Sequence, residues 1–391
     1  MYPLGFTAAQ RFDYEQTLRS SHQAEVDVDV LDLDGHVLSS VSANVLDGQV
    51  LGDRHGFGQP NGPQRRLTLS LLDPSFDLKF DTPSLRNGSL YYDRLVRVHY
   101  NVRVPALGEW VSCPVFTGAP WKLQRAEAEV YIEADDASVL GMGEIWTPLH
   151  IKKGTPKVAA AKTILGHAGF TRFRFPDRRA KLAHSISIGR RGHAWAQASR
   201  LLASMDLQLY VDGRGVPTAR HLPEHALWTF NPGQNGEIVD AVNRSSDRND
   251  FYNVVTVIGR KPHGAKKRVS YTAYPKRSHP DSPWSLVRDN GEDPYFKELV
   301  VRNDHYRTNA ECERVARRKL AEVIRTKEEL TASILPWPHL EQGDMATFRT
   351  LAGGVVTDRV DTFTLPLAAG QSQPMTIGWF DRPAVHRRVR R

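Results

Sequence analysis

The sequence has little cysteine and no long apolar run. Of its 391 residues only Cys113 and Cys312 are cysteines, and no Cys-x-x-Cys pair occurs. A disulfide scaffold or a zinc ribbon needs several suitably spaced thiols, so neither is supported. We expect both cysteines to be small buried side chains. No apolar stretch approaches the roughly 20 residues that a membrane-spanning helix needs, so we expect no membrane span.

A secretion signal is also missing. The start, "MYPLGFTAAQRFDYEQ", lacks a basic segment followed by an apolar stretch and a small-residue cleavage site. We therefore expect the protein to be made and folded in the cytoplasm. With 40% hydrophobic and 25% charged residues, the composition is that of a soluble globular protein, and the length predicts two or three domains.

The formal charge of +8 favours a polyanionic partner only weakly, because net charge governs solubility and loose association rather than fold. Basic residues gather in four places: 172–191, 261–268, 314–319 and the tail "HRRVRR" at 386–391. We interpret each cluster as a solvated face or tail, with a nucleic-acid or interface role as the alternative.

The first third of the chain predicts β-structure. "AEVDVDVLDLDGHVLSSVSANV" alternates valines with carboxylates and turns at Asp34-Gly35, which indicates a hairpin. Four further strand patterns follow at the spacing of a β-barrel or β-sandwich: "RRLTLSLLD", "RLVRVHYNVRV", "VSCPVFTGAPWKL" and "AEAEVYIEADD".

Between residues 145 and 230 the hydrophobic period becomes helical. "TPKVAAAKTILGHAGF" predicts a helix with Thr155 as N-cap, Pro156 in the first turn and Gly166 near the end. A second helix should bury Trp195, Ala198, Leu201 and Leu202, and a strand pair turning at Asp212-Gly213 should follow. This segment therefore predicts a small α/β module.

The last third predicts more β-structure around a helix. "TNAECERVARRKLAEVIRTK" combines a Thr308–Glu311 capping box with an apolar stripe. The stripe consists of Cys312, Val315, Ala316, Leu320, Val323 and Ile324. The segment before it, from "YPKRSHP" to "ELVV", should be irregular. Strands should resume in "ELTASILPW", "GDMATFRT", "VTDRVDTFTLPL" and "QPMTIGWF".

The stretch "NDFYNVVTVIGRKPHGAKKRVSYTA", residues 249–273, comes closest to a nucleotide-binding motif. Gly259 and Gly264 have P-loop spacing, but a P-loop needs Lys-Ser/Thr and a helix after its second glycine, whereas a strand pattern follows here. A hairpin is the better interpretation. Both faces of its first strand carry apolar groups, so we expect a second layer or another subunit to cover it.

Other chemical motifs are incomplete. The calcium pattern suggested by "DVDVLDLDG" is broken by Val30, and Val41 stands where its closing glutamate belongs. His221 and His225 are separated by Pro223, which would break the helix that aligns two zinc ligands. We expect aspartates on a wet hairpin face and a histidine pair in a loop.

Paired carboxylates for general acid and base catalysis are represented only by Asp135-Asp136. Because adjacent strand residues point to opposite faces, these two should not form a pair. No Gly-x-Ser-x-Gly elbow is present. We predict no catalytic residue, no metal site and no cofactor, although residues from distant segments could still be brought together by folding.

Several stretches in order together resemble the hub proteins at the tips of phage tails. This group includes baseplate hubs, the late-control protein and tail-associated hub domains, and the nearest subgroup is the minor tail proteins of actinobacteriophages. The matching stretches are "SSHQAEVDVDVLDLDG" with "DGQV" at 47–50, "RRLTLSLLD" at 65–73, "EADDASVL" at 133–140, "AWAQASRLLASMDLQLYVDGRG" at 194–215, "NVVTVIGR" at 253–260, "DSPWS" at 281–285 and "LPWPHLEQGDMATF" at 335–348.

This resemblance implies a mainly β, α+β fold with two tail-tube-like β-barrels, an intervening α/β module and a helical insertion in the second barrel. The predicted parts are an N-terminal segment 1–23, a first barrel 24–140, an α/β module 141–235, a discontinuous second barrel 236–273 and 328–382, an insertion 274–327 and a basic tail 383–391. Three chains would form a ring with pseudo-sixfold symmetry, built on heterologous contacts.

The implied function is structural, at the tail tip of the virion. The ring would adapt the sixfold tube of a non-contractile siphophage tail to the threefold tip, close the channel, anchor tip proteins and let DNA pass on infection. Its implied partners are two further copies, the distal tail or tube protein, the tape-measure protein and tip or fibre proteins. Some relatives carry a cell-wall-degrading domain at the C-terminus, and we do not expect one after "TIGWFDRPA".

Two alternatives remain open from the sequence. One is a tail-associated enzyme that degrades cell-wall polymer, and the other is a basic nucleic-acid-binding module. The candidate contact residues for a partner, for DNA or for the lumen lie in the basic turn of the hairpin: Lys261, Lys266, Lys267 and Arg268.

Overall fold

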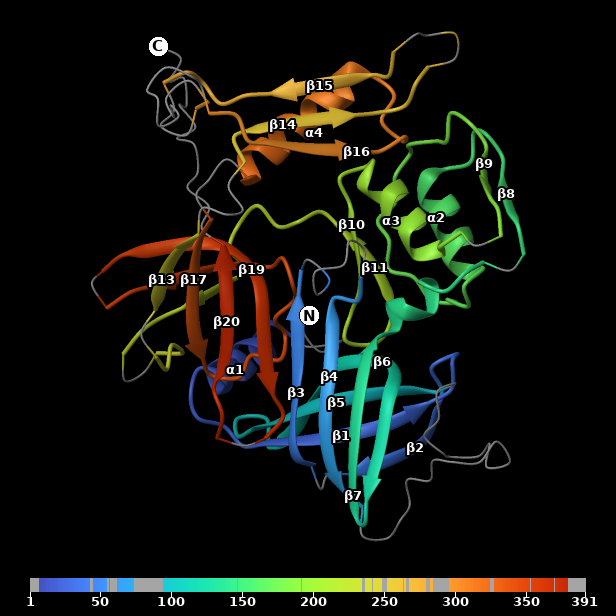
Figure 1. Ribbon diagram of the computed structural model, residues 1–391. Helices are drawn as coiled ribbons and strands as arrows, with labels where there is room; N and C mark the ends of the chain where they lie inside the picture. The colour runs from blue at the N-terminus through green and yellow to red at the C-terminus, as the bar shows by residue number, and fades with distance from the viewer. Residues whose placement is uncertain are drawn as a thin grey trace. The chain divides into compact units, whose positions relative to one another are not determined.

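The computed structural model is mainly β, with four α-helices among the residues that it describes, and so belongs to the predicted α+β class (Figure 1). It describes residues 7–378 apart from 43–44, 55, 57–61, 74–93, 146, 191, 234–235, 241, 248–251, 263, 265–266, 279–281, 284–294, 324–326, 352 and 369. Within these ranges no helix combines the length and apolar character needed to cross a membrane.

The chain divides into two compact units. Unit 1 comprises Met1–Val242, Ala332–Val355 and Val360–Thr376. Unit 2 comprises Asn243–Thr331, Val356–Arg359 and Ile377–Arg391.

Unit 1 begins with helix α1 and a set of antiparallel strands. The elements are α1 (Ala8–Leu18), β1 (Ala24–Leu31), β2 (Val37–Ser42), β3 (Val45–Asp53), β4 (Arg65–Leu72), β5 (Leu95–Val104), β6 (Glu109–Ala126) and β7 (Glu129–Asp136). The hydrogen-bonded order is β3-β4-β7-β6-β5-β1-β2. The predicted hairpin at Asp34-Gly35 joins β1 to β2, and Gly35 has the positive φ of 87° that such a turn favours. Closure of these strands into a barrel stays a prediction.

Strand alternation builds the core of this sheet. In β4, Leu67, Leu69 and Leu71 are fully buried, while the residues between them are half-buried. In β7, Val130 and Ile132 point into the same core. Helix α1 adds Tyr14 and Leu18 to the buried set, and a Thr7–Gln10 capping box fixes its start.

The α/β module of unit 1 has the two predicted helices. Its elements are the 3-10 helix η1 (Ala137–Gly141), β8 (Leu149–Ile151), α2 (Lys157–Gly166), β9 (Ile186–Ile188), α3 (Ala194–Ala203), β10 (Gln208–Val211) and β11 (Pro217–Arg220). The predicted apolar face of α3 is buried at Trp195, Ala198, Leu201 and Leu202, and packs against α2 (Figure 1).

One local prediction for this module is wrong. Thr155 does not cap α2, because its hydroxyl donates a 2.8 Å hydrogen bond to the Lys152 carbonyl instead. Pro156 occupies the N-cap position without a side-chain cap. The threonine hydroxyl is satisfied within the preceding turn, a local competition that is common for Ser and Thr.

The C-terminal strands of unit 1 continue the same sheet. They are β12 (Trp228–Phe230), β18 (Met345–Arg349) and parts of β17 (Lys327–Ile334), β19 (Val355–Pro366) and β20 (Gln373–Gly378). β19 pairs with β3, and β18 joins β19 and β12. A Cβ at Gly52 would lie 2.4 Å from the ring of Phe363, so any larger residue there would force this ring to move. The pairing of β19 with β3 thus joins these C-terminal strands to the N-terminal strands in one hydrogen-bonded sheet.

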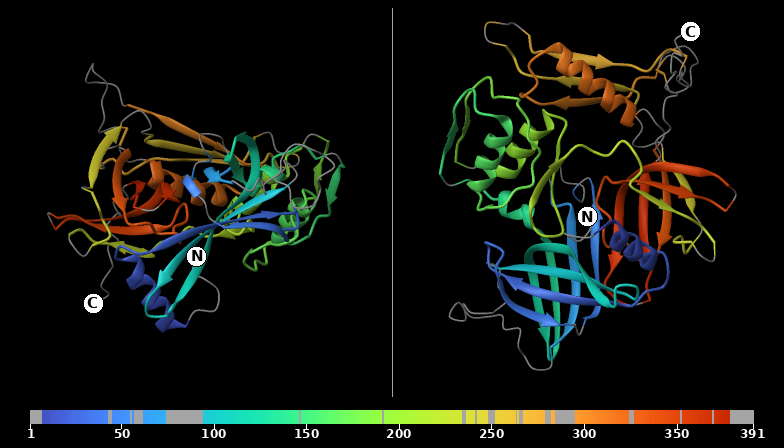
Figure 2. Two further views of the ribbon diagram at one scale, coloured as in Figure 1. Left: turned by 90° about the horizontal axis from the view of Figure 1, so that it is seen from below. Right: turned by 180° about the vertical axis from the view of Figure 1, so that it is seen from behind.

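Unit 2 contains a small sheet covered by a helix. The sheet consists of β14 (Val254–Ile258), β15 (Ser270–Ala273) and β16 (Glu298–Arg302), and the helix is α4 (Asn309–Val323). Unit 2 also contains β13 (Asn243–Asp247), which pairs with β17. β14 lies between antiparallel β15 and parallel β16, and α4 crosses one face of this sheet (Figure 2). The predicted capping box is present, since Glu311 N–H donates to the Thr308 hydroxyl at 3.1 Å.

The hairpin 249–273 differs in part from expectation. The antiparallel strands 254–258 and 270–273 are present, with no helix after the turn, as the rejection of a P-loop requires. We expected the hairpin to open the sheet of a second barrel, but its other hydrogen-bonded neighbour is β16, from a segment predicted to be irregular. Strand β16 has only five residues, and its alternating apolar residues Leu299 and Val301 are only partly buried. Its pattern is therefore weak beside the many turn-forming residues that precede it.

The expectation that a second layer covers β14 is confirmed for one face. Val255 and Val257 are fully buried against Cys312, Val315 and Ala316 of α4. On the other face Val254 is buried as well, while Thr256 and Ile258 are half-buried. Ile324, the last predicted residue of the helical stripe, and Phe251 lie outside the described residues.

Candidate functional site

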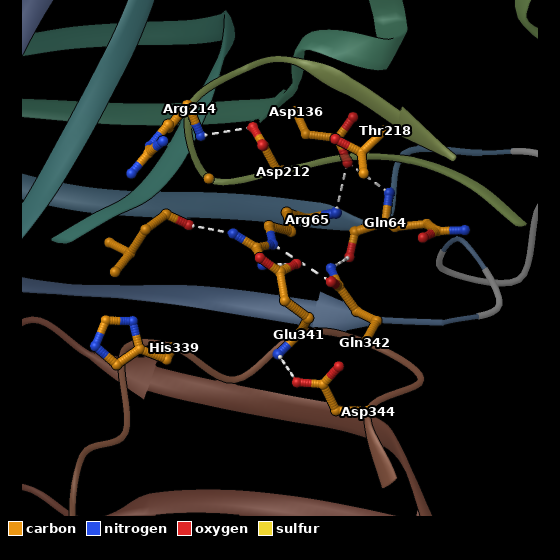
Figure 3. A network of polar contacts seen from close by, with 12 residues as sticks. Gln64, Arg65, Asp136, Asp212, Arg214, Thr218, His339, Glu341, Gln342 and Asp344 are labelled. Carbon is orange, nitrogen blue, oxygen red and sulfur yellow. Dashed lines mark hydrogen bonds and ion pairs between the residues drawn. The ribbon is translucent and has the colours of Figure 1, made fainter. Parts of the chain in front are cut away.

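A cluster of buried and half-buried polar side chains lies in unit 1 where segments far apart in the sequence meet (Figure 3). We call this cluster the polar junction. Its members are Gln64, Arg65, Asp136, Asp212, Arg220, Glu341, Gln342 and Asp344.

Arg65 is the centre of the junction. Its side chain is 4% exposed, and its Nη2 donates to Glu341 Oε2 at 2.5 Å. Nη1 donates to the Val115 carbonyl of β6 at 2.6 Å, and Nε lies 3.4 Å from Gln342 Oε1. The first residue of β4 is therefore bonded both to β6 and to the segment before β18. The planar fork of arginine suits such a multivalent role, because its N–H groups point in fixed directions.

The segment Glu341–Asp344 forms the other wall of the junction. Asp344 Oδ2 accepts hydrogen bonds from the backbone N–H of Glu341 at 3.1 Å and from the Trp228 indole at 3.1 Å. Arg220, at the end of β11, donates to Asp344 Oδ1 at 2.7 Å and to the Gln342 carbonyl at 2.9 Å. The α/β module is thereby bonded to the C-terminal strands.

Asp136 closes the side nearest β7. Its Oδ2 accepts the backbone N–H groups of Gln64 and Arg65, both at 2.7 Å, and its Oδ1 accepts that of Ser138 at 2.9 Å. Complete burial raises the pKa of this carboxyl above its usual range. Asp135 points the other way and pairs with Arg66 at 2.8 Å. The prediction that these adjacent carboxylates cannot form a pair is therefore confirmed.

The turn between β10 and β11 packs against β6. A Cβ at Gly213 would lie only 2.1 Å from the Pro114 carbonyl oxygen, so this approach requires glycine. The Gly213 carbonyl accepts a 2.9 Å hydrogen bond from the Thr117 hydroxyl. Asp212 holds the turn by accepting two backbone N–H groups, and burial followed by the nearby Glu341 charge raises the pKa of its carboxyl.

These groups are arranged to bind one another. The acceptors of Asp136, Asp212, Glu341 and Asp344 are directed at arginines, backbone amides or an indole. A general acid–base pair would instead direct its carboxylates at a cavity for substrate. The junction therefore fixes the geometry of unit 1. Removing one partner of such a buried ion pair leaves an uncompensated charge, which typically costs about 3–5 kcal/mol.

Cys113 and His339 lie beside the junction, with Sγ 3.4 Å from Nδ1. The cysteine is 3% exposed, and burial raises the pKa of its thiol to about 11, so the thiolate nucleophile is scarce at neutral pH. Both cysteines are free and buried, as the sequence predicted.

Sequence reasoning missed the junction, although signals for it exist. Arg65 occupies the same alternating face as Leu67, Leu69 and Leu71, and Asp136 occupies the same face as Val130 and other buried positions of β7. A charge on an apolar face of a strand must find a buried partner. That pattern marks Arg65 and Asp136 individually, but it does not tell which distant segment supplies the partner.

The predicted contact residues of the basic turn fall outside the junction. Lys261 and Lys267 are exposed, and Lys266 lies outside the described residues. Arg268 forms an ion pair with Asp304 and donates to the Gly259 carbonyl at 3.0 Å, so it stabilises unit 2 itself.

The weaker motifs are accounted for locally. Asp32 accepts the backbone N–H of His36 at 2.8 Å within the β1–β2 turn; with Asp34 these groups form an exposed cluster whose ligand atoms lie within 4.8 Å of one another. His221 and His225 follow the end of β11, outside any helix, as expected, and His221 Nδ1 lies 2.9 Å from the Asp206 carbonyl.

Solved structures with the same fold are phage tail proteins. A tail protein from Neisseria meningitidis superposes with a TM-score of 0.61 at 12% identity, over 92% of this chain and 97% of that one. A 43 kDa tail protein of prophage MuSo2 from Shewanella oneidensis gives 0.58 at 9% identity, over 91% and 98%. Prophage tail protein gp18 from Listeria monocytogenes gives 0.51 at 11% identity, over 90% and 94%.

The chain therefore has the fold of phage tail proteins over nearly its whole length, as the resemblance in sequence implied. Searches by sequence find neither a matching family model nor a similar curated protein.

Proposed function

We propose that the chain is a non-enzymatic structural protein of a phage tail tip, located in the virion. One observation carries this proposal: the likeness to tail proteins extends over at least 90% of this chain and at least 94% of each of the three neighbours. A shared module would give a local match. A match over the whole length means that the strands, the α/β module and their connections are arranged alike.

The polar junction supports a mechanical role. It lies where four stretches of the family resemblance meet, namely 65–73, 133–140, 194–215 and 335–348. Directional bonds among buried charges fix distances and angles more strictly than apolar packing does. A subunit that transmits force along a tail requires such a fixed frame.

The finer part of the proposal concerns assembly. Three copies would form a ring that adapts a sixfold tube to a threefold tip, closes the channel, anchors tip proteins and lets DNA pass. Partners would be the distal tail or tube protein, the tape-measure protein and tip or fibre proteins. Trp110 and Trp121 of β6 are 38% and 47% exposed, and exposed aromatic groups of this size favour burial at a protein contact.

Lys261 and Lys267 are proposed contacts of this assembly with DNA or a partner. Both extend from the β14–β15 turn into solvent. Replacing both by Gln should weaken DNA retention at low salt and leave folding unchanged. Binding of DNA that is independent of salt, or equal in the double variant, would remove this assignment.

A deletion and rescue experiment tests the function. Phage lacking the gene should produce heads but no infectious particles, and the chain supplied in trans should restore infectivity and co-purify with tails. Infectious particles that lack the chain would contradict the proposal.

Zymography on cell walls of the host tests the alternative that the chain is an enzyme. Purified chain should leave the walls intact. Clearing that a single carboxylate substitution abolishes would show an enzyme instead.

A further inference from the structure

A small surface cavity in unit 1 lies outside the polar junction and is used by nothing described above. Its volume is about 30 Å³. Six segments form its wall: the β1–β2 turn with the end of β1, the start of β5, Thr117 of β6, η1, residues 169–172 and the β10–β11 turn with the start of β11. A cavity of this size accommodates about one small polar group, since one water needs roughly 10–15 Å³ by this measure.

Three arginines from three of these segments line the cavity. They are Arg97 of β5, Arg172, and Arg214 of the β10–β11 turn, and we call this site the arginine pocket. Gly35 lies between two of them: a Cβ there would be 2.5 Å from Arg172 Nη2 and 3.8 Å from Arg97 Nη2. A side chain at Gly35 would overlap the Arg172 guanidinium but would only touch that of Arg97, so glycine leaves room for Arg172 beside Arg97.

The three guanidinium groups lack an internal counter-ion within ion-pair distance. Arg97 Nε is buried without a hydrogen-bond partner, and no carboxylate of the described residues forms an ion pair with any of the three. Burial, together with repulsion from Arg172 and Arg214, lowers the pKa of Arg97 despite attraction from nearby aspartates. Like charges gathered in this way favour an anion from outside.

The neighbouring carboxylates are engaged elsewhere or lie at the surface. Asp29 lies 3.1 Å from His99 Nε2, and Asp212 lies 3.4 Å from Arg174 Nη1. Asp34 lines the pocket but is exposed. The net charge of the pocket lining therefore stays positive.

We propose that the arginine pocket binds the carboxylate of an acidic side chain on a partner protein. A guanidinium fork matches the two oxygens of a carboxylate, which gives bidentate and charge-assisted hydrogen bonds. Leu31, Leu95 and Phe170 also line the pocket and would contact the methylene stem of Asp or Glu. A nucleic acid would bind through many phosphates along a broad basic surface, whereas this site offers one small cavity. The inference concerns ligand chemistry and does not depend on the proposed function.

Thermal stability in the presence of small probes tests the pocket in the full chain. At constant ionic strength set with chloride, sodium acetate should raise the unfolding midpoint saturably. A capped Ala-Glu-Ala peptide should do the same, and its Ala-Gln-Ala counterpart should bind at least about tenfold more weakly, since loss of a charged hydrogen bond has about this effect.

Substitutions assign the effect to the pocket. Arg172→Gln should weaken acetate and Ala-Glu-Ala binding about tenfold, and it should fold normally because Arg172 is exposed. Arg97→Gln should do the same, and the exposed Arg179→Gln, away from the pocket lining, serves as the matched control with wild-type binding.

Three outcomes would overturn the inference. They are the absence of a saturable effect of acetate in the wild type, equal binding of the Glu and Gln peptides, and an effect that survives Arg172→Gln. A stronger and equally Arg172-dependent effect of inorganic phosphate than of either carboxylate would assign the pocket to a phosphate ligand, which also contradicts the proposal.

Discussion

The two units hold their parts together by different means. In unit 1 the polar junction joins β4, β6, the α/β module and the segment before β18 through buried charges; the Arg65 and Glu341 side chains are 4% and 7% exposed. In unit 2 the helix α4 meets β14 through Val255, Val257 and other apolar groups, and the ion pairs Arg268–Asp304 and Arg317–Glu313 are exposed. Directional bonds specify one geometry, whereas apolar contacts stabilise in proportion to area. We expect a single substitution in the polar junction of unit 1 to cause a large loss of stability. A substitution in the core of unit 2 should cause a loss in proportion to the apolar area removed.

Replacing the central arginine should have the largest effect on stability. Arg65→Met leaves Glu341 buried without its cation, so the free energy of unfolding should fall by about 3–5 kcal/mol in urea titrations. Arg66→Met is the matched control: its side chain is 38% exposed and pairs with Asp135, so the loss should stay below about 1 kcal/mol. Equal losses for the two variants would remove the distinction between junction and surface.

The glycine of the β10–β11 turn should be the next most sensitive position. Gly213→Ala places a Cβ against the Pro114 carbonyl and should cost up to about 3 kcal/mol of unfolding free energy. Gly166, at the end of α2, has open space around the same atom, so Gly166→Ala should be neutral or stabilising by up to about 1 kcal/mol. Thermal unfolding followed by circular dichroism compares the two, and a neutral Gly213→Ala would show that the turn can move away from β6.

In unit 2 a core truncation should have an intermediate effect. Val257→Ala removes buried methyl groups from the contact with α4 and should cost about 2 kcal/mol. Val300 of the same sheet is 45% exposed, and its replacement by Ala should change stability by less than about 0.5 kcal/mol. Urea unfolding checks both, and similar values would indicate that α4 does not shield the sheet.

Cysteine labelling should distinguish the unfolding of unit 1 from that of unit 2 without any substitution. Cys113 belongs to unit 1 and Cys312 to unit 2, and both are buried. Because smaller units bury less surface, Cys312 should react with a thiol reagent at lower urea concentrations than Cys113. Burial raises the pKa of Cys113 to about 11, so neither thiol should label quickly in native buffer at pH 8. Labelling of both at the same rate would indicate that the units open together.

The smallest expected effect concerns histidine in unit 1. Burial lowers the pKa of His22 below its ordinary value of 6.5. The unfolded chain then binds this proton more readily, so the stability that His22 contributes is present above about pH 6.5 and is lost as the pH falls through the folded-state pKa. The urea midpoint of the wild type should therefore fall more between pH 7 and 5 than that of His22→Gln. A His22→Gln profile that follows the wild type would contradict the assignment.

Much of the local structure could be predicted from sequence, and the long-range pairings could not. Alternation located β4 and β7, and a capping box with an apolar stripe located α4. The same rule of alternation separated Asp135 from Asp136 correctly. By contrast, the parallel pairing of β14 with β16 depends on a contact across more than 40 residues, which no local pattern encodes.

The polar junction shows the same limit for the site. Alternation places Arg65 on a buried face, but its partner Glu341 lies 276 residues away, and only the fold brings them together. The arginine pocket is also assembled from distant segments, and the basic cluster 172–191 pointed to only one of its three arginines. The basic turn Lys261–Arg268, which stood out in the sequence, supplies one structural ion pair and two exposed lysines.

A reconstruction of intact tail tips by electron microscopy would show whether the chain belongs to the tail tip. We predict density for this chain at the end of the tail, in three copies around the tail axis, with unit 1 fitting as one body through the polar junction. Tail tips that contain no density for the chain, or copies located in the head, would contradict it.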